Sequence, residues 1–111
     1  MLSRRNESPV RTVRTFINAT NAHDFSTVEK LLADNFRMID MCGAELIGMQ
    51  PCIAFMCRFA AVVPDYRIRV SDLVQRGEDI LISGQSTSDH PDVDLAVQWR
   101  AQASAGKLQE W

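Results

Sequence analysis

One carboxylate stands in an otherwise apolar run of this chain: Asp40, between Met38 and Cys42. The run is too short for a helix between its neighbouring turns, so it predicts a short, mostly buried strand over residues 36–42. Side chains of a strand alternate between its two faces, and Asp40 therefore shares a face with Phe36 and Met38. Burial among apolar groups raises the pKa of a carboxyl toward that of a base working near neutral pH. Asp40 is the first candidate for chemistry.

A structural role is the alternative for Asp40. Its carboxylate would then accept hydrogen bonds from backbone amides at the end of the strand, or pair with Arg37 or Arg58. The two roles predict different surroundings, because a base must face a cavity that holds a substrate, whereas a structural carboxylate is held by its own chain.

The two histidines are the next candidates. His90 lies in a polar loop, where a neutral imidazole would relay a proton to or from Asp40, and where it is otherwise a solvated residue between Asp89 and Asp92. His23 lies between two predicted helices, and we expect a structural role for it, with the following Asp24 capping the next helix.

The sequence lacks the usual patterns of metal and nucleophile sites. No H-x-x-x-H, E-x-x-H or C-x-x-C spacing occurs, so we expect no metal. No G-x-S-x-G motif or Gly-rich phosphate loop occurs either, which leaves cofactor-free chemistry. The three cysteines, Cys42, Cys52 and Cys57, cannot all pair and lie among apolar residues, so they predict reduced core side chains.

Composition excludes several classes of protein. The chain has 111 residues, 46% of them hydrophobic and 23% charged, which is typical of one globular domain, here residues 8–111 after a loose tail over 1–7. A net charge of −2 gives no field for nucleic acid. The absence of a long apolar stretch or a signal-peptide pattern predicts a cytoplasmic protein without a membrane partner.

Hydrophobic periodicity predicts helices first and strands afterwards. Ser8 and Pro9 are a typical helix start, and the sequence Ser26 to Glu29 matches a capping box for a second helix. The predicted helices cover about residues 9–22, 26–33 and 51–63, and the predicted strands cover 36–42, 66–74, 79–87, 93–104 and 107–111. This order is typical of an α+β fold with helices packed on one face of a curved sheet.

The chain from Ser8 onward resembles the nuclear transport factor 2-like superfamily, in particular its ketosteroid isomerase and SnoaL-like polyketide cyclase branches. The residues that carry the likeness are Asn21-Ala22-His23-Asp24, Leu31-Leu32-Ala33-Asp34-Asn35-Phe36, Asp40-Met41-Cys42-Gly43 with Gly48, and Ala105-Gly106-Lys107-Leu108-Gln109-Glu110-Trp111. The resemblance implies a cone-shaped, curved antiparallel sheet that wraps around helices on its concave face and leaves an internal pocket.

By this resemblance, Asp40 holds the position of the isomerase's general base in the pattern D-x-x-G, although the stretch from Gly43 to Gly48 is one residue shorter here. The helix tyrosine of the isomerase corresponds to Phe16, which has no donor. Its second oxyanion donor falls on Gln98, or on Trp99 if the turn is one residue shorter, and neither is a carboxylic acid. Loss of one such donor typically costs about 2.7–4 kcal/mol of transition-state stabilisation.

Seven apolar side chains are candidates for lining the pocket around a hydrophobic small molecule: Phe16, Phe36, Met38, Met56, Phe59, Trp99 and Trp111. Two classes of function follow. In the first, a cofactor-independent isomerase or cyclase, Asp40 takes a proton alpha to a carbonyl, Gln98 or Trp99 stabilises the oxyanion, and His90 or Asp40 returns the proton. The alternative is a non-catalytic ligand-binding or dimerisation module. For either class, the resemblance implies a homodimer formed through the sheet.

Overall fold

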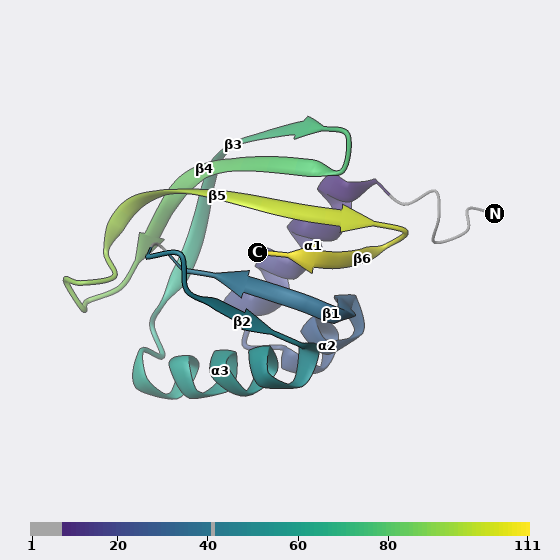
Figure 1. Ribbon diagram of the computed structural model, residues 1–111. Helices are drawn as coiled ribbons and strands as arrows, with labels where there is room; N and C mark the ends of the chain where they lie inside the picture. The colour runs from purple at the N-terminus through teal and green to yellow at the C-terminus, as the bar shows by residue number, and fades with distance from the viewer. Residues whose placement is uncertain (1–7, 41) are drawn as a thin grey trace.

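The computed structural model describes residues 8–40 and 42–111 as three helices and one six-stranded sheet (Figure 1). The predicted tail over residues 1–7 lies outside the described residues. The helices are α1 (Pro9–Asn21), α2 (Phe25–Leu31) and α3 (Met49–Val62). The strands are β1 (Leu32–Ile39), β2 (Glu45–Ile47), β3 (Arg67–Arg76), β4 (Asp79–Thr87), β5 (Leu95–Ser104) and β6 (Lys107–Glu110). Among the described residues, no helix is long and apolar enough to span a bilayer.

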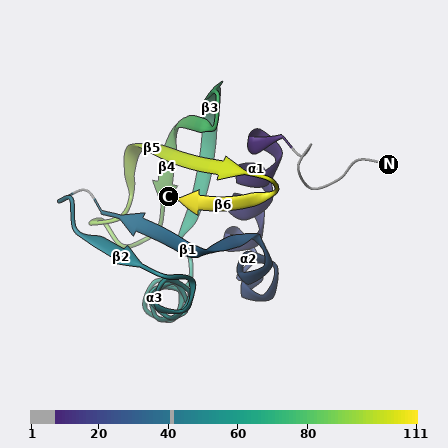
Figure 2. The same ribbon diagram turned by 45° about the vertical axis from the view of Figure 1, so that its right-hand side comes forward.

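The strands form one sheet in the order β2-β1-β6-β5-β4-β3, antiparallel except for the parallel pair β1 and β6. Helix α1 packs against β3, β4, β5 and β6, and α3 packs against β1 and β2. Figures 1 and 2 show that the sheet bends around these helices, with α1 behind β5 and β6 and α3 along the β1–β2 end. The predicted α+β class, with a mostly antiparallel curved sheet, is confirmed.

Helix α1 begins as the sequence predicts. Ser8 Oγ accepts a hydrogen bond from Val10 N at 3.2 Å, and Pro9 occupies the first turn, where a missing N–H leaves no bond unmade. The buried side of the helix packs into the core under the sheet and comprises Thr12, Val13, Phe16, Ile17 and Ala19.

The second helix starts earlier than its predicted capping box. Asp24 is the cap, because its Oδ1 accepts a hydrogen bond from Thr27 N at 3.2 Å and its Oδ2 from Thr27 Oγ1 at 2.7 Å. Strand β1 then follows α2 without a break, so the predicted helix end at about residue 33 and the predicted strand limits 36–42 are wrong. The pairing of Leu32 with Leu108 of β6 starts the strand at Leu32, four residues before its predicted start.

Helix α1 is tied to the edge strand β3 by one side-chain amide. Asn21 Nδ2 donates to Ile68 O at 2.9 Å, and Ile68 N donates to Asn21 Oδ1 at 2.8 Å. The next strand approaches β3 closely where the sheet bends, because a Cβ on Gly84 would lie 2.1 Å from Arg69 O. Only glycine fits at that point.

A register shift in β6 turns its last residue to the outer face of the sheet. Ala103 of β5 pairs with Leu108, whereas the preceding Gln102 pairs with Glu110, so β6 advances two residues for one residue of β5. Leu108 therefore faces the helices, and Glu110 faces the opposite, outer face together with Gln102. Such a bulge changes which face later side chains occupy.

Glu110 is held on the outer face by two arginines. Its Oε1 lies 2.6 Å from Arg37 Nη2 of β1, and its Oε2 lies 2.7 Å from Arg100 Nη2 of β5. Only 3% of the Glu110 side chain is exposed, against 44% for Arg37 and 51% for Arg100. Burial alone would raise the pKa of Glu110, but the bonds from Arg100 and Arg37 outweigh it and hold that pKa below its ordinary value of 4.5.

Replacing Glu110 with Gln removes the charge that both arginines bind while keeping the shape of the side chain. We expect Glu110→Gln to lower the free energy of unfolding at neutral pH by about 1–3 kcal/mol. Because the folded-state pKa is depressed, the stabilisation by the charge is complete above 4.5 and is lost as the pH falls through the lower folded-state value. Urea unfolding at a series of pH values measures this difference.

The matched control is Glu45→Gln, which removes only the 3.5 Å contact between an exposed Glu45 and Arg37. We expect a change below about 0.5 kcal/mol at every pH. Equal losses in the two variants, or a Glu110→Gln difference that does not shrink in acid, would contradict the assignment.

Candidate functional site

An apolar cavity of 210 Å³ lies between α1, α3 and the concave face of the sheet. We call it the inner cavity, and its lining residues are Phe16, Thr20, His23, Phe25, Met38, Phe55, Met56, Phe59, Ala60, Val63, Tyr66, Ile68 and Trp111. Most of these side chains are aromatic or aliphatic. Among the described residues, the lining contains no Asp, Glu, Lys or Arg, so the cavity favours an uncharged guest.

A second hollow of 600 Å³ adjoins the inner cavity along β5 and the loop that precedes it. This outer pocket shares Met38, Phe59, Tyr66 and Trp111 with the inner cavity and adds Asp40, Ser86, Asp92, Gln98, Trp99 and Arg100 among its lining residues. The shared side chains form the boundary between the two spaces, so a guest of the inner cavity lies against residues of the outer pocket.

Trp111 is the central wall of the site. Its ring centroid lies 4.9 Å from that of Phe16 on α1 and 5.8 Å from that of Trp99 on β5. Its backbone is fixed, because Trp111 N donates to Arg37 O at 3.0 Å and Ile39 N donates to Trp111 O at 3.0 Å. The last residue of the chain is therefore a positioned part of the site.

Three polar side chains interrupt the apolar lining of the inner cavity. Burial raises the pKa of the Tyr66 hydroxyl, against a hydrogen bond with Ser86, so Tyr66 stays neutral at physiological pH. The ring of Phe59 meets that of Tyr66 edge to face at 4.9 Å. His23 adopts a positive φ of 56° in the connection after α1, and its ring stacks on Phe25 with centroids 6.0 Å apart.

The third polar group is the hydroxyl of Thr20, in the last turn of α1. Two other threonines of this helix satisfy their hydroxyls by donating to the carbonyl four residues earlier, Thr12 to Ser8 O at 3.4 Å and Thr15 to Arg11 O at 2.9 Å. Thr20 Oγ1 is buried and has no hydrogen-bond partner among the described residues. A buried hydroxyl without a partner typically costs about 1–3 kcal/mol.

Asp40 lies in the turn between β1 and β2, and its carboxylate is bound by its own chain. Its Oδ1 accepts hydrogen bonds from Cys42 N at 2.8 Å and from Ala44 N at 2.9 Å. The residue is exposed, so the predicted burial of Asp40 is wrong. Asp40 borders the outer pocket and not the inner cavity. This geometry matches the structural alternative, because the short turn places two amides within reach of the carboxylate.

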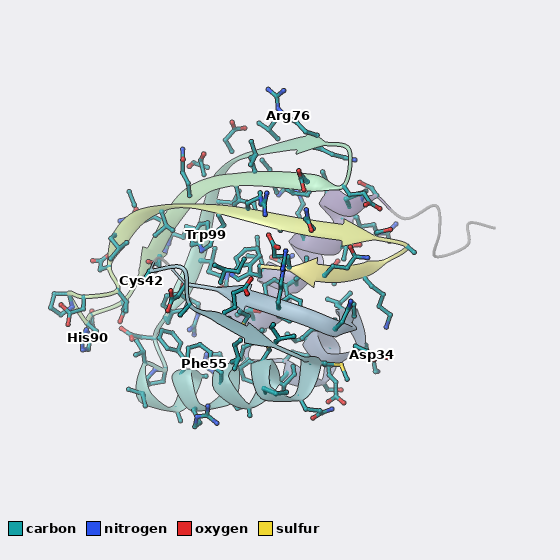
Figure 3. All side chains as sticks on the ribbon, viewed as in Figure 1. Asp34, Cys42, Phe55, Arg76, His90 and Trp99 are labelled. Atoms are coloured by element: carbon teal, nitrogen blue, oxygen red, sulfur yellow. The ribbon has the colours of Figure 1, made fainter. Side chains whose placement is uncertain are left out.

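The structure separates the other two predicted catalytic residues from the inner cavity. His90 is exposed at the tip of the loop between β4 and β5, where its Nδ1 accepts from Asp92 N at 3.3 Å (Figure 3). It lines neither the inner cavity nor the outer pocket. Gln98 is exposed and pairs with Ser83, whereas Trp99 pairs with Ile82 and stacks on Trp111. Of the two residues left open for the oxyanion position, Trp99 is the one on the concave face.

Most of the predicted lining residues come together. Phe16, Met38, Met56, Phe59 and Trp111 line the inner cavity, and Trp99 lines the outer pocket. Phe36 is fully buried in the core and lines neither space, so its predicted place in the pocket is wrong. Sequence reasoning missed Thr20, His23 and Tyr66 as lining residues. Thr20 lies four residues after Phe16, and residues four apart share a helix face. This spacing would have identified Thr20 as a lining residue.

The cysteines have different environments. Cys52 is buried, its Sγ donates to Leu46 O at 3.3 Å, and burial raises the pKa of its thiol, so it is an unreactive core residue as predicted. Cys42 and Cys57 are exposed, so the prediction of core positions is wrong for both. Within residues 8–40 and 42–111, no group of three His, Cys, Asp or Glu side chains is placed to hold a metal ion.

Solved structures with a similar fold belong to proteins that are named after several different activities. A candidate polyketide cyclase from Sinorhizobium meliloti aligns with a TM-score of 0.82 at 12% identity, covering 94% of this chain and 96% of that one. A candidate ketosteroid isomerase from Kribbella flavida gives 0.79 at 16% identity, covering 92% and 73%. An epoxide hydrolase from M. tuberculosis, described as LEH-like, gives 0.73 at 19% identity, covering 93% and 78%. These identities establish a common fold alone.

No curated protein matches the sequence at a significant level. The profile of the SnoaL-like domain matches residues 13–110, which include most of α1, the whole sheet and every aromatic side chain of the inner cavity except Trp111. With this match over most of its length and the shared NTF2-like fold, the chain belongs to the SnoaL-like domain family.

Proposed function

We propose that this protein binds an uncharged, mostly apolar small molecule in the inner cavity. The observation that carries the proposal is a 210 Å³ hollow that remains open between α1, α3 and the sheet although its walls are aromatic and aliphatic. An open apolar space beside a wider pocket is typical of a ligand site.

The wide outer pocket supplies the route of access in this proposal. It shares Met38, Phe59, Tyr66 and Trp111 with the inner cavity, so small rotations of these side chains connect the two spaces. Among the described residues, none of the Asp, Glu or Arg side chains of the outer pocket lines the inner cavity, and this favours binding over catalysis by a carboxylate.

Proton abstraction from a carbon acid is a second candidate function, favoured by one observation. Asp40 borders the outer pocket together with Met38 and Trp111, and both of its backbone hydrogen bonds fall on Oδ1, which leaves Oδ2 for a substrate proton. In this candidate Trp99 contributes an indole N–H on the concave face, where the resemblance expects an oxyanion donor.

We also propose that two copies of the chain pair through the outer face of the sheet. Strand pairing places Ile39, Ile47, Val74 and Leu81 on this face, and each of these side chains is 38–61% exposed. They surround the Glu110 cluster with its two arginines. An apolar patch around a mixed-charge centre is self-complementary under a two-fold axis, as a homodimer interface requires.

Filling the inner cavity tests the binding proposal. We expect the neutral single-ring dye 4-(dimethylamino)benzonitrile, whose emission depends on the polarity of its surroundings, to bind with a change in fluorescence, and Ala60→Phe to raise its dissociation constant about ten-fold or more by occupying the cavity. The matched control is Ala61→Phe, which adds the same side chain at the neighbouring exposed position of α3. No dye binding to the wild type, or equal effects of the two variants, would refute the proposal.

Two substitutions of Asp40 separate its roles. Asp40→Asn keeps an oxygen for the amides of Cys42 and Ala44, whereas Asp40→Ala removes it. We expect the alanine variant to lose about 0.5–1.5 kcal/mol of stability and the asparagine variant to lose less than half of that, with dye binding unchanged in both. Deuterium exchange at the alpha carbons of cyclohexanone measures the catalytic candidate, which is excluded if wild type and Asp40→Asn exchange at the same rate.

A charge on the outer face tests the dimer. Light scattering after size exclusion should give twice the 12.5 kDa mass of one chain for the wild type and the single mass for Leu81→Lys. The control is Val62→Lys, because Val62 on α3 is 78% exposed and lies away from the sheet's outer face. A monomeric wild type, or dimers in all variants, would contradict pairing through this surface.

A further inference from the structure

One residue that lines the inner cavity, Thr20, carries a hydroxyl without a hydrogen-bond partner among the described residues. Among the described residues, Thr20 Oγ1 is the single buried side-chain nitrogen or oxygen that makes no hydrogen bond. The buried Thr12 on the same helix, by contrast, donates its hydroxyl to Ser8 O at 3.4 Å. Buried polar groups almost always make a hydrogen bond, so the exception at Thr20 indicates a hydrogen-bond partner from outside the chain, such as a bound ligand.

Building on the proposed pocket, we infer that Thr20 selects ligands that carry an acceptor oxygen, and that the guest is a compact ring compound with one such oxygen. A threonine hydroxyl has a proton to donate, and the nearest helix carbonyl, four residues earlier, does not receive it. A carbonyl, ether or hydroxyl oxygen of the guest accepts a hydrogen bond from this hydroxyl.

The position of Thr20 allows this contact. The residue lines the inner cavity beside Phe16, and its side chain as a whole is only partly buried although the oxygen itself is shielded. A helical threonine has two favourable χ1 rotamers, and rotation between them moves the hydroxyl to a different side of the Cα–Cβ bond. The hydroxyl therefore reaches the cavity without any movement of α1.

The size and walls of the cavity define the rest of the guest. An apolar cavity of about 150 Å³ holds benzene, so a space of 210 Å³ fits one ring with a small substituent. Trp111, Phe59 and Phe25 contribute flat apolar surfaces around that space. Because the described lining residues include no Asp, Glu, Lys or Arg, an ionised group on the guest would find no carboxylate, ammonium or guanidinium partner there.

The test compares two probes of the same ring size, cyclohexanone with an acceptor oxygen and methylcyclohexane without one. Both are measured by the emission of Trp111 in a Trp99→Phe background, where it is the sole tryptophan. We expect Thr20→Val, which keeps the shape and removes the hydroxyl, to raise the dissociation constant of cyclohexanone about five-fold and to leave that of methylcyclohexane within about two-fold.

Thr20→Ser is the matched control, because it restores the hydroxyl and should restore the cyclohexanone affinity. Thr20→Val should also melt at the same temperature as the parent or higher, since it removes an unpaired buried polar atom. If the two probes respond equally to Thr20→Val, or if that variant is less stable, the inference is overturned while the binding proposal stands. If neither probe binds the parent protein, both fail.

Discussion

The carboxylate of Glu110 is the interaction on which the geometry of the site depends. Strand β6 has only four residues, so few backbone bonds hold it between β1 and β5. Glu110 adds a buried charge that binds Arg37 on β1 and Arg100 on β5. These two ion pairs connect β6 to both of its neighbouring strands. Because side chains alternate along a strand, fixing Glu110 on the outer face fixes Trp111 on the concave face. The ion pairs of Glu110 on the outer face of the sheet thus position the Trp111 side chain on the concave face.

That wall determines what the site is able to do. Trp111, between Phe16 and Trp99, limits the inner cavity to a small apolar volume whose polar groups are hydroxyls and an imidazole. Such a lining stabilises a guest through burial of apolar surface and selects it through single hydrogen bonds. Relatives of the same fold bear names of cyclases, isomerases and hydrolases. A fold shared by proteins with such different names does not determine an activity.

Asp40 shows how a local interaction competes with a tertiary one. The apolar residues around it suggested burial, and its position matched a general base, yet the turn that follows β1 offers two amides within three ångström of its carboxylate. Gly43, with a φ of 84°, makes that tight turn possible. A carboxylate already bound by exposed backbone amides gains nothing from moving into an apolar cavity, where it would lose both these bonds and water.

The sequence by itself determined the start of α1 at Ser8 and Pro9, the α+β class, the long strands with alternating side chains and most of the aromatic lining, because these depend on local periodicity and capping. It left open whether Gln98 or Trp99 faces the cavity, and it gave no sign that Glu110 would be buried on the outer face of the sheet. Those choices follow from strand register, and a shift of one residue exchanges the two faces of a strand. Register depends on partners far away in the chain, such as Arg37 for Glu110, so only the tertiary structure decided it.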